Sequence, residues 1–305
     1  MRAGRTPCSC GRPGRLLKSI QWKLALTGAN VFPSDGIKDL EGGCRLFRNA
    51  ARFLSLSGLA VLLATATPAS AQDSEAKAAF KAMSDFLTQQ ATLSVSYDAT
   101  LEIVTEDLEK VGLASSGALN ATRPDKLRAT RSGGLANVEL VFDGTEMSVY
   151  GKNLNVFAKQ AFKGTIDELV DALRLEFGLE LPAADLLSAN PNDIMMLNVT
   201  DAQALGTGVI RGQTCDHLAF RTDDVDWQIW IAQGDKPFPC RFTITSKMTV
   251  MAPSYDITFS DWKSGAEVAK DDYKLVTAAG ATEVDISKLG SLDEVQMPKT
   301  EGAAQ

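Results

Sequence analysis

The sequence predicts an α+β protein in which a curved antiparallel sheet carries helices over one of its faces. Two stretches place apolar residues three and four positions apart, which is the pattern of a helix that lies on another element. Many short runs alternate apolar and polar residues, as strands with one buried face do. The breaks between these runs are short and rich in turn residues, so neighbouring strands are expected to be antiparallel.

The first predicted element is a helix over residues 73–90. Asp73 and Ser74 stand in front of it as capping residues. Its apolar stripe consists of Ala76, Ala79, Phe80, Met83, Phe86 and Leu87. Because only one face is apolar, this helix must lie on another part of the protein.

Strand-like runs follow as far as residue 160. They cover residues 93–104, 111–121, 127–131, 138–142, 147–150 and 154–158. Turn residues separate them at 123–125, 132–134, 143–144 and 151–153. Such short connections favour neighbouring antiparallel strands.

A helical insert is predicted midway through the sheet. Thr165 and Glu168 have the spacing of a capping box at the start of a helix that ends at Gly178. Its apolar stripe is Ile166, Leu169, Val170, Leu173 and Phe177. Pro182 then begins a short helix that runs to Leu187, and residues 193–197 add another turn.

Strands resume after the insert, and the domain ends before a polar tail. The later runs cover residues 208–211, 214–221, 227–232, 241–251, 255–262 and 273–277. Neither an internal repeat nor a linker-like change of composition interrupts residues 72–290. We therefore expect a single domain there, followed by a flexible tail over residues 291–305.

Residues 45–71 have the pattern of a secretory signal peptide. Basic residues precede an apolar run at 53–66, and small residues end the segment: Arg45, Arg48 and Arg52, then Ala69, Ser70 and Ala71. The apolar run is shorter than the about 18 residues that cross a bilayer. We expect cleavage near Ala71 and Gln72, and an exported chain without a transmembrane segment.

Residues 1–44 do not fit a signal peptide, which normally begins within a few residues of its basic region. The stretch is rich in Arg and Gly and has no periodicity. We interpret it as a non-native or disordered leader that lies upstream of the true start site. The alternative is a genuine long leader.

Export changes the charge of the chain. Residues 1–71 contain ten of the 31 basic and three of the 38 acidic side chains, so 21 basic groups remain against 35 acidic ones, a net charge of about −14. An acidic surface repels phosphate backbones and anionic head groups. We therefore expect no nucleic-acid partner and no electrostatic docking to membranes.

Cys215 and Cys240 are the cysteines that remain after export, in a compartment where disulfides persist. We favour one bridge between them. Two buried free thiols are an alternative, and so is a nucleophile built from Cys215 and His217, although side chains two positions apart on a strand lie about 7 Å from each other. The bridge needs a bent strand end, because a simple meander over residues 213–246 places the two cysteines on its outer strands.

Patterns for catalysis or metal binding are scarce. The single histidine, His217, excludes sites that need two imidazoles, such as HExxH proteases. It lies in an alternating segment, where a packed and hydrogen-bonded core residue is a simpler interpretation than a general base. We predict no catalytic residues, no metal site and no cofactor.

Apolar surface is the remaining feature that points to function. If the two amphipathic helices cover the apolar face of the sheet incompletely, a cavity lined by strand residues is left. The candidate lining residues are Val95, Tyr97, Leu101, Ile103, Trp227, Ile229 and Ile231. The alternative is a filled core.

The order of the elements and four short segments point to a known family. The segments are HLAFR at 217–221, DWQIWI at 226–231, PFP at 237–239 and DW at 261–262. Over about residues 75–290 the chain resembles a family of predicted periplasmic proteins with a domain of unknown function, in the superfamily of LolA- and LolB-like lipoprotein carriers.

This resemblance implies an unclosed antiparallel β-barrel in the periplasm, with a helical lid over an apolar cavity that accepts acyl chains. In LolA-like carriers the arginine of an Arg-Pro pair at a strand start helps to tie the strand to the lid. Arg123 is the matching residue, followed by Pro124. The chain departs from the carriers in its longer helical insert and in the pair Cys215 and Cys240.

Three classes of function remain. The leading hypothesis is a non-enzymatic periplasmic protein that binds a lipid or an acyl chain between sheet and helices. The second is a protein-interaction or envelope-sensing module on the same scaffold, because an exposed sheet edge accepts an added strand from an envelope protein partner. A hydrolase is the third, without a residue pattern that supports it.

Overall fold

The computed structural model describes residues 69–134, 136–176, 181 and 183–286. The expectations for the leader, for the tail at 291–305, for most of the signal peptide and for Phe177 and Gly178 lie outside the described residues.

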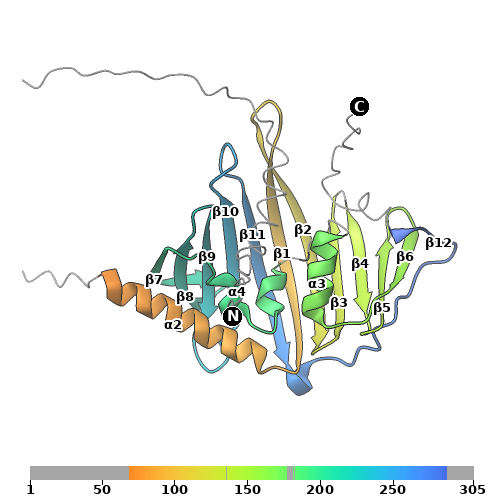
Figure 1. Cartoon of the computed structure of the whole chain (residues 1–305), viewed down its shortest axis with the longest axis horizontal. Helices are drawn as coiled ribbons and strands as arrows, with labels where there is room; N and C mark the ends of the chain where they lie inside the picture. The colour runs from red at the N-terminus through yellow and green to blue at the C-terminus, as the bar shows by residue number, and fades with distance from the viewer. Residues whose placement is uncertain (1–68, 135, 177–180, 182, 287–305) are drawn as a thin grey trace, which may run out of the picture.

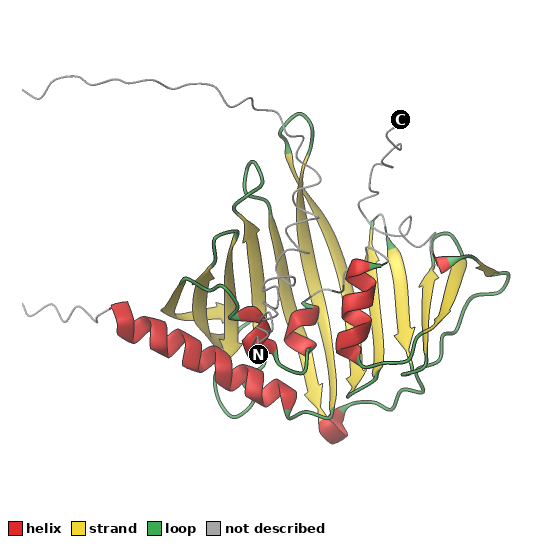
Figure 2. Ribbon diagram, in the orientation of Figure 1, coloured by secondary structure: helices red, strands yellow, loops and turns green. Residues whose placement is uncertain are grey.

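In the described residues, twelve strands form one large curved sheet (Figures 1 and 2). The strands are β1 Thr92–Val104, β2 Lys110–Thr122, β3 Lys126–Gly133, β4 Asn137–Phe142, β5 Glu146–Gly151, β6 Val156–Ala161, β7 Asp201–Ile210, β8 Gln213–Arg221, β9 Val225–Ala232, β10 Pro239–Ser246, β11 Ser254–Ser264 and β12 Thr282–Glu283. Their order across the sheet is β12-β6-β5-β4-β3-β2-β1-β11-β10-β9-β8-β7. All neighbours are antiparallel except β12, which runs parallel to β6.

This arrangement confirms the predicted fold class. The outer strands β7 and β12 lie at opposite ends of the sheet, so the barrel is unclosed. The junction between its halves is the pairing of β1 with β11, in which Tyr97 faces Phe259 across a large sequence separation.

Three strand expectations are wrong, two in their bounds and one because no strand forms. β7 begins at Asp201 rather than at residue 208, because Gly206 and a bulge between Ala204 and Thr207 interrupt its alternation. β10 ends at Ser246 rather than at residue 251, and a hairpin loop follows it. Residues 273–277 do not form a strand, although Tyr273 is buried.

The helices all lie on one face of the sheet, except for a short turn after β11. They are α2 Ala69–Thr88, α3 Ile166–Leu175, η1 Ala184–Leu187, α4 Pro191–Met195 and η2 Gly265–Glu267. The expected cleavage point falls in the first turn of α2. The capping box of α3 is confirmed, since Thr165 N–H donates to Glu168 Oε2 at 2.7 Å and Glu168 N–H donates to Thr165 Oγ1 at 3.3 Å.

Two groups of helices divide the covered face between them. α2 lies across the end of the sheet formed by β7 to β9, and α3 stands in front of β2 and β3 (Figure 1). Beneath α2, the ring of Phe80 packs edge-on against Trp227, with centroids 5.3 Å apart, and against Phe220 at 5.7 Å. Phe220 on β8 and Trp227 on β9 both point toward α2, because alternate side chains of a strand lie on the same face of the sheet.

The chain after β11 returns along the sheet to reach β6. We call residues 268–283 the C-terminal strap. Arg128 of β3 donates to both carboxylate oxygens of Asp271 at 2.7 and 2.9 Å and also contacts Glu139, while Tyr273 hydrogen-bonds Thr122 at 2.7 Å. Since Leu127 and Ala129 point to the helices, Arg128 and the strap lie on the opposite face.

Candidate functional site

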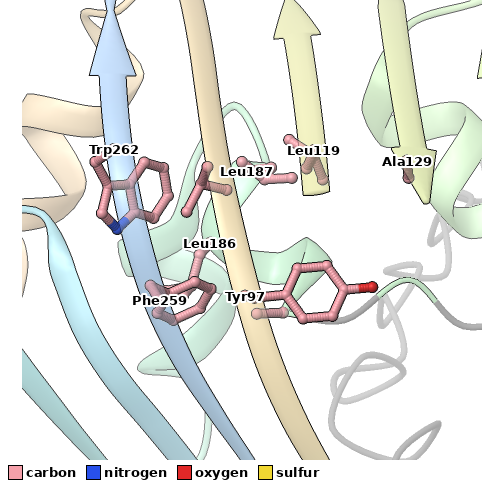
Figure 3. A pocket seen from close by; sticks show the side chains of 9 residues that line it. Tyr97, Leu119, Ala129, Leu186, Leu187, Phe259 and Trp262 are labelled. Carbon is pink, nitrogen blue, oxygen red and sulfur yellow. The ribbon is translucent and has the colours of Figure 1, made fainter. Parts of the chain in front are cut away.

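A small apolar pocket lies between the sheet and the insert (Figure 3). Its walls are Val95 and Tyr97 of β1, Leu119 of β2, Ala129 of β3, Phe259 and Trp262 of β11, and Ala183, Leu186 and Leu187 of the insert. The space in it open to the centre of a water molecule is about 20 Å³. This is room for about one water molecule.

Strand pairing brings the sheet side of the pocket together. Val95 faces Leu119, which in turn faces Ala129, so their side chains form one row across three strands. The small side chain of Ala129 leaves the space that a larger residue would fill.

Two aromatic side chains form rigid parts of the wall. Tyr97 O–H donates to the carbonyl of Thr130 at 2.9 Å, and its ring lies where a side chain at Gly117 would collide with it. Trp262 donates its Nε1–H to the carbonyl of Pro239 at 2.8 Å and stacks on Phe238.

The predicted lining residues fall into three groups. Val95 and Tyr97 line the pocket. Leu101 and Ile103 share their strand face but lie farther toward the β1–β2 hairpin, half-buried and outside the pocket.

Trp227, Ile229 and Ile231 lie on β9 in the packed core and do not line the pocket. Ile229 is fully buried. The physical reason is α2, which covers this end of the sheet. Sequence reasoning did not select Leu119, Ala129, Phe259 and Trp262 as lining residues. Strand alternation is the signal that identifies Leu119 and Ala129 as residues of a buried face.

Arg123 connects the turn after β2 to the insert. Its Nη1–H donates to the carbonyl of Ser188, just after η1, at 3.3 Å. Burial lowers the pKa of the Arg123 guanidinium, and the carboxylate of Asp167 on α3 opposes this effect. Asp167 itself accepts hydrogen bonds from the backbone N–H of Ala189.

A second arginine holds η1 against α3. Arg174 pairs with Asp185 at 2.9 Å, and their side chains are only 6% and 13% exposed. Burial raises the pKa of Asp185, and the adjacent Arg174 opposes that shift. The segment from Ala184 to Ser188 is therefore held to its neighbours by polar contacts as well as by apolar ones.

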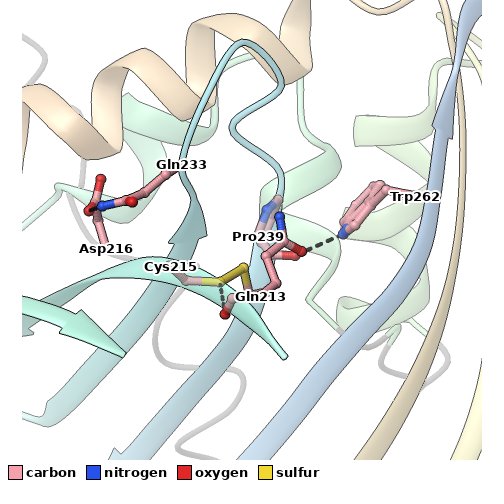
Figure 4. Close-up of a disulfide and its surroundings, with 7 residues drawn as sticks. Gln213, Cys215, Asp216, Gln233, Pro239 and Trp262 are labelled. Atoms are coloured by element: carbon pink, nitrogen blue, oxygen red, sulfur yellow. Dashed lines mark hydrogen bonds between the residues drawn. A yellow bond between two sulfur atoms is a disulfide. The ribbon is translucent and has the colours of Figure 1, made fainter. Parts of the chain in front are cut away.

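The predicted disulfide between Cys215 and Cys240 is confirmed (Figure 4). The Cα atoms are 6.8 Å apart. The bend that the bridge needs is a bulge in β10, where the pairing with β9 shifts between Pro239 and Arg241 and leaves Cys240 as the extra residue. With both sulfurs bonded, Cys215 has no thiolate for nucleophilic chemistry.

His217 is hydrogen-bonded, as expected, but it does not lie in the core. Its Nε2 is 2.8 Å from Gln228 Oε1, and its ring stacks on Trp230 with centroids 4.1 Å apart. Because Leu218 and Phe220 of the same strand point to the helices, His217 lies half-buried on the opposite face.

Two other kinds of feature are absent from the described part of the chain. Within these ranges, no group of three His, Cys, Asp or Glu side chains is placed to hold a metal ion. None of the described helices has both the length and the apolar content to cross a membrane.

The model of one protein family, described as "Predicted periplasmic protein (DUF2092)", matches residues 76–287. None of the curated proteins compared with the chain matches it.

Several solved structures are similar to the chain. An uncharacterized conserved protein from Thermus thermophilus is 13% identical over 68% of this chain and 98% of that one, with a TM-score of 0.40. The lipoprotein LppX of Mycobacterium tuberculosis is 18% identical over 65% and 100%, with a TM-score of 0.39. A chain of the MucA/MucB complex of Pseudomonas aeruginosa is 13% identical over 66% and 61%, with a TM-score of 0.39.

Proposed function

The chain belongs to the family of predicted periplasmic proteins whose model it matches, and from this premise we propose that it is a non-enzymatic binding protein that holds a lipid or an acyl chain between the sheet and the insert. The observation that carries this proposal is the apolar pocket beneath η1. All nine residues of its lining contribute carbon-rich surface, and none of them carries a charge.

The size of the pocket requires that the insert moves when a chain enters. Its present space is too small for an acyl chain. Ala183, Leu186 and Leu187 belong to a short segment outside the sheet, so displacing them breaks no strand pairing. Each chain CH₂ transferred from water to this surface contributes about 0.8 kcal/mol, which offsets the packing energy that η1 gives up when it moves.

A pair of substitutions on neighbouring strands tests the site. Ala129→Phe adds a ring inside the pocket from β3, whereas Ala118→Phe adds the same ring to the exposed opposite face of β2. We expect Ala129→Phe to weaken binding of a fluorescent fatty acid at least about tenfold, since the ring occupies the volume of several methylenes. Ala118→Phe should leave the affinity unchanged.

Protein purified without detergent should also carry a lipid that native mass spectrometry detects. If wild-type protein carries no lipid and binds neither fatty-acid nor phospholipid probes, the proposed function is wrong. Unchanged affinity in a folded Ala129→Phe variant would place the ligand elsewhere. Ile229→Asp is not a selective test, because it buries an unpaired carboxylate in the packed core.

The edge strand β7 supports a second candidate function, binding of an envelope protein. Among the residues that the structure describes, no strand pairs with its outer side, and Leu205 and Val209 are 49% and 69% exposed. A photo-cross-linking residue at Val209 should capture a partner in cells, and one at Leu154, which is 60% exposed near the other end of the sheet, should not. Equal capture at both positions would argue against strand addition at β7.

A further inference from the structure

Buried polar atoms without a partner gather around η1. In the described residues, seven buried side-chain nitrogen and oxygen atoms have no hydrogen-bond partner within the protein. Five of them are Nε and Nη2 of Arg123, Nε and Nη1 of Arg174, and Oγ of Ser188. Buried donors are nearly always paired in folded proteins, so this cluster indicates a partner that comes from outside the chain.

Arg123 and Ser188 are in direct contact. One nitrogen of the guanidinium, Nη1, donates to the carbonyl of Ser188 at 3.3 Å, and this leaves Nε–H and Nη2–H free. Ser188 is only 7% exposed, and its hydroxyl is also free. Two kinds of hydrogen-bond donor therefore lie together at the end of η1.

These donors adjoin the apolar pocket. Leu187, which precedes Ser188 in the chain, lines the pocket, and so does Leu119, which shares β2 with the residues leading to Arg123. Strand alternation places Arg123 on the side of the sheet that carries Leu119. An amphiphile with its chain in the pocket would have its head group beside Arg123.

Arg123 supplies a positive charge for an anionic head group. The carboxylate of Asp167 offsets part of this charge from a distance, but its oxygens accept from the N–H of Ala189, and Arg123 forms no ion pair with a described residue. Arg174, in contrast, already has Asp185 as its partner. A buried guanidinium without an ion pair binds an added anion through charge-assisted hydrogen bonds.

We propose that Arg123 and Ser188 form a head-group subsite, in which the free N–H groups and the hydroxyl bind the anionic oxygens of an acyl ligand. Both the carboxylate of a fatty acid and the phosphodiester of a phospholipid have this chemistry. The subsite rests on the proposed lipid-binding function and narrows it to anionic amphiphiles.

The experiment compares cis-parinaric acid with its methyl ester by fluorescence titration of the full-length protein at pH 8, where the acid is ionised. The two probes share one chain and differ in the head group. Wild-type protein should bind the acid about ten- to a hundredfold more tightly than the ester, as expected for charge-assisted hydrogen bonds. Competition by oleic acid and by oleoyl-lysophosphatidylglycerol then distinguishes the two sources of the anion.

Two variants and one control variant test whether Arg123 and Ser188 cause the preference for the acid over the ester. Arg123→Gln and Ser188→Ala should each lower the ratio of the affinity for the acid to the affinity for the ester. Arg123→Gln also removes the hydrogen bond that holds η1, so its effect is measured as this ratio and not as either affinity alone. Ser188→Ala removes a single oxygen, so it keeps the test valid if Arg123→Gln fails to fold. Lys126→Gln removes an exposed positive charge at the start of β3, three residues after Arg123, and should change neither affinity.

The possible outcomes distinguish the head-group subsite from the broader proposal that the protein binds lipids. If acid and ester bind equally tightly to the wild type, or if both variants weaken the two probes alike, the head-group subsite is wrong and lipid binding stands. If neither probe binds to the wild type, both proposals are wrong.

Discussion

The end of the sheet formed by β7 to β9 and the centre of the sheet, around β1 and β11, bury their inner faces in different ways. Beneath α2, three aromatic rings from Phe80, Phe220 and Trp227 pack directly against one another. Beneath η1, aliphatic and aromatic side chains surround a small pocket, and the covering segment is held by two largely buried arginines, Arg123 and Arg174.

This difference indicates which part of the protein can open. Separating α2 from β9 would expose several large rings to water without any compensating interaction. η1 itself contributes only the smaller side chains of Leu186 and Leu187 to this contact, and its polar groups regain hydrogen bonds with water when it moves. The packed end beneath α2 therefore serves as the scaffold, and the η1 segment over the centre of the sheet is the part that can change conformation.

The largest predicted effect tests the packed end. Phe80→Ala should lower the free energy of unfolding by about 3 to 5 kcal/mol, because it leaves a cavity among fully buried rings. Leu187→Ala, at the pocket, should cost only about 2 kcal/mol, since its side chain already borders empty space. Urea denaturation of both variants measures the two losses, and equal losses would contradict the comparison.

The disulfide strengthens the packed end further. Replacing Cys215 and Cys240 together by serine should lower stability by about 3 kcal/mol, because the bridge closes a loop of 25 residues in the unfolded chain. Denatured, unreduced protein from an oxidising compartment should contain no titratable thiol at these positions. Two free thiols would show that the bridge is absent from the isolated protein.

The C-terminal strap should release in acid. Hydrogen bonds from Arg128 hold the pKa of Asp271 below its ordinary value, despite partial burial. A lowered pKa stabilises the fold above the unfolded value of about 3.9 and stops doing so as the pH falls through the folded value. Asp271→Asn should therefore cost about 1 to 2 kcal/mol at pH 7 and little near pH 2.

Asp272 provides the matched control for this prediction. Its carboxylate lies 3.8 Å from the same guanidinium, but the side chain is 70% exposed. Asp272→Asn should leave stability almost unchanged at either pH, as measured by thermal unfolding. If the two asparagine variants behave alike, the strap is not held by the pair of Arg128 and Asp271.

The smallest effect concerns the start of α3. Thr165→Ala removes the capping hydrogen bond to Glu168 and should destabilise the helix by about 1 kcal/mol. Hydrogen exchange of the first amides of α3 should accelerate, while the amides of α2 keep their protection. Thr105→Ala, which removes a similar bond in the β1–β2 hairpin, should not alter exchange in α3.

Local sequence determined most elements of this protein. The apolar stripe that contains Phe80 and the spacing of Thr165 and Glu168 specify helices, because both depend on residues within a few positions of one another. The pair Cys215 and Cys240 is likewise visible in the sequence. Gly206 and the bulge beside it hid the first part of β7, since they interrupt the alternation on which strand prediction depends.

The tertiary structure decided which of the buried faces borders the pocket. Alternation predicts that both Tyr97 and Ile229 point to the helices, but it does not say that α2 covers Ile229 while η1 covers Tyr97 only partly. Trp262 lies in the pocket wall because β1 pairs with β11, and these two strands lie more than a hundred residues apart in the chain. Similarly, Ser188 meets Arg123 because of a contact between distant segments, which no local pattern encodes.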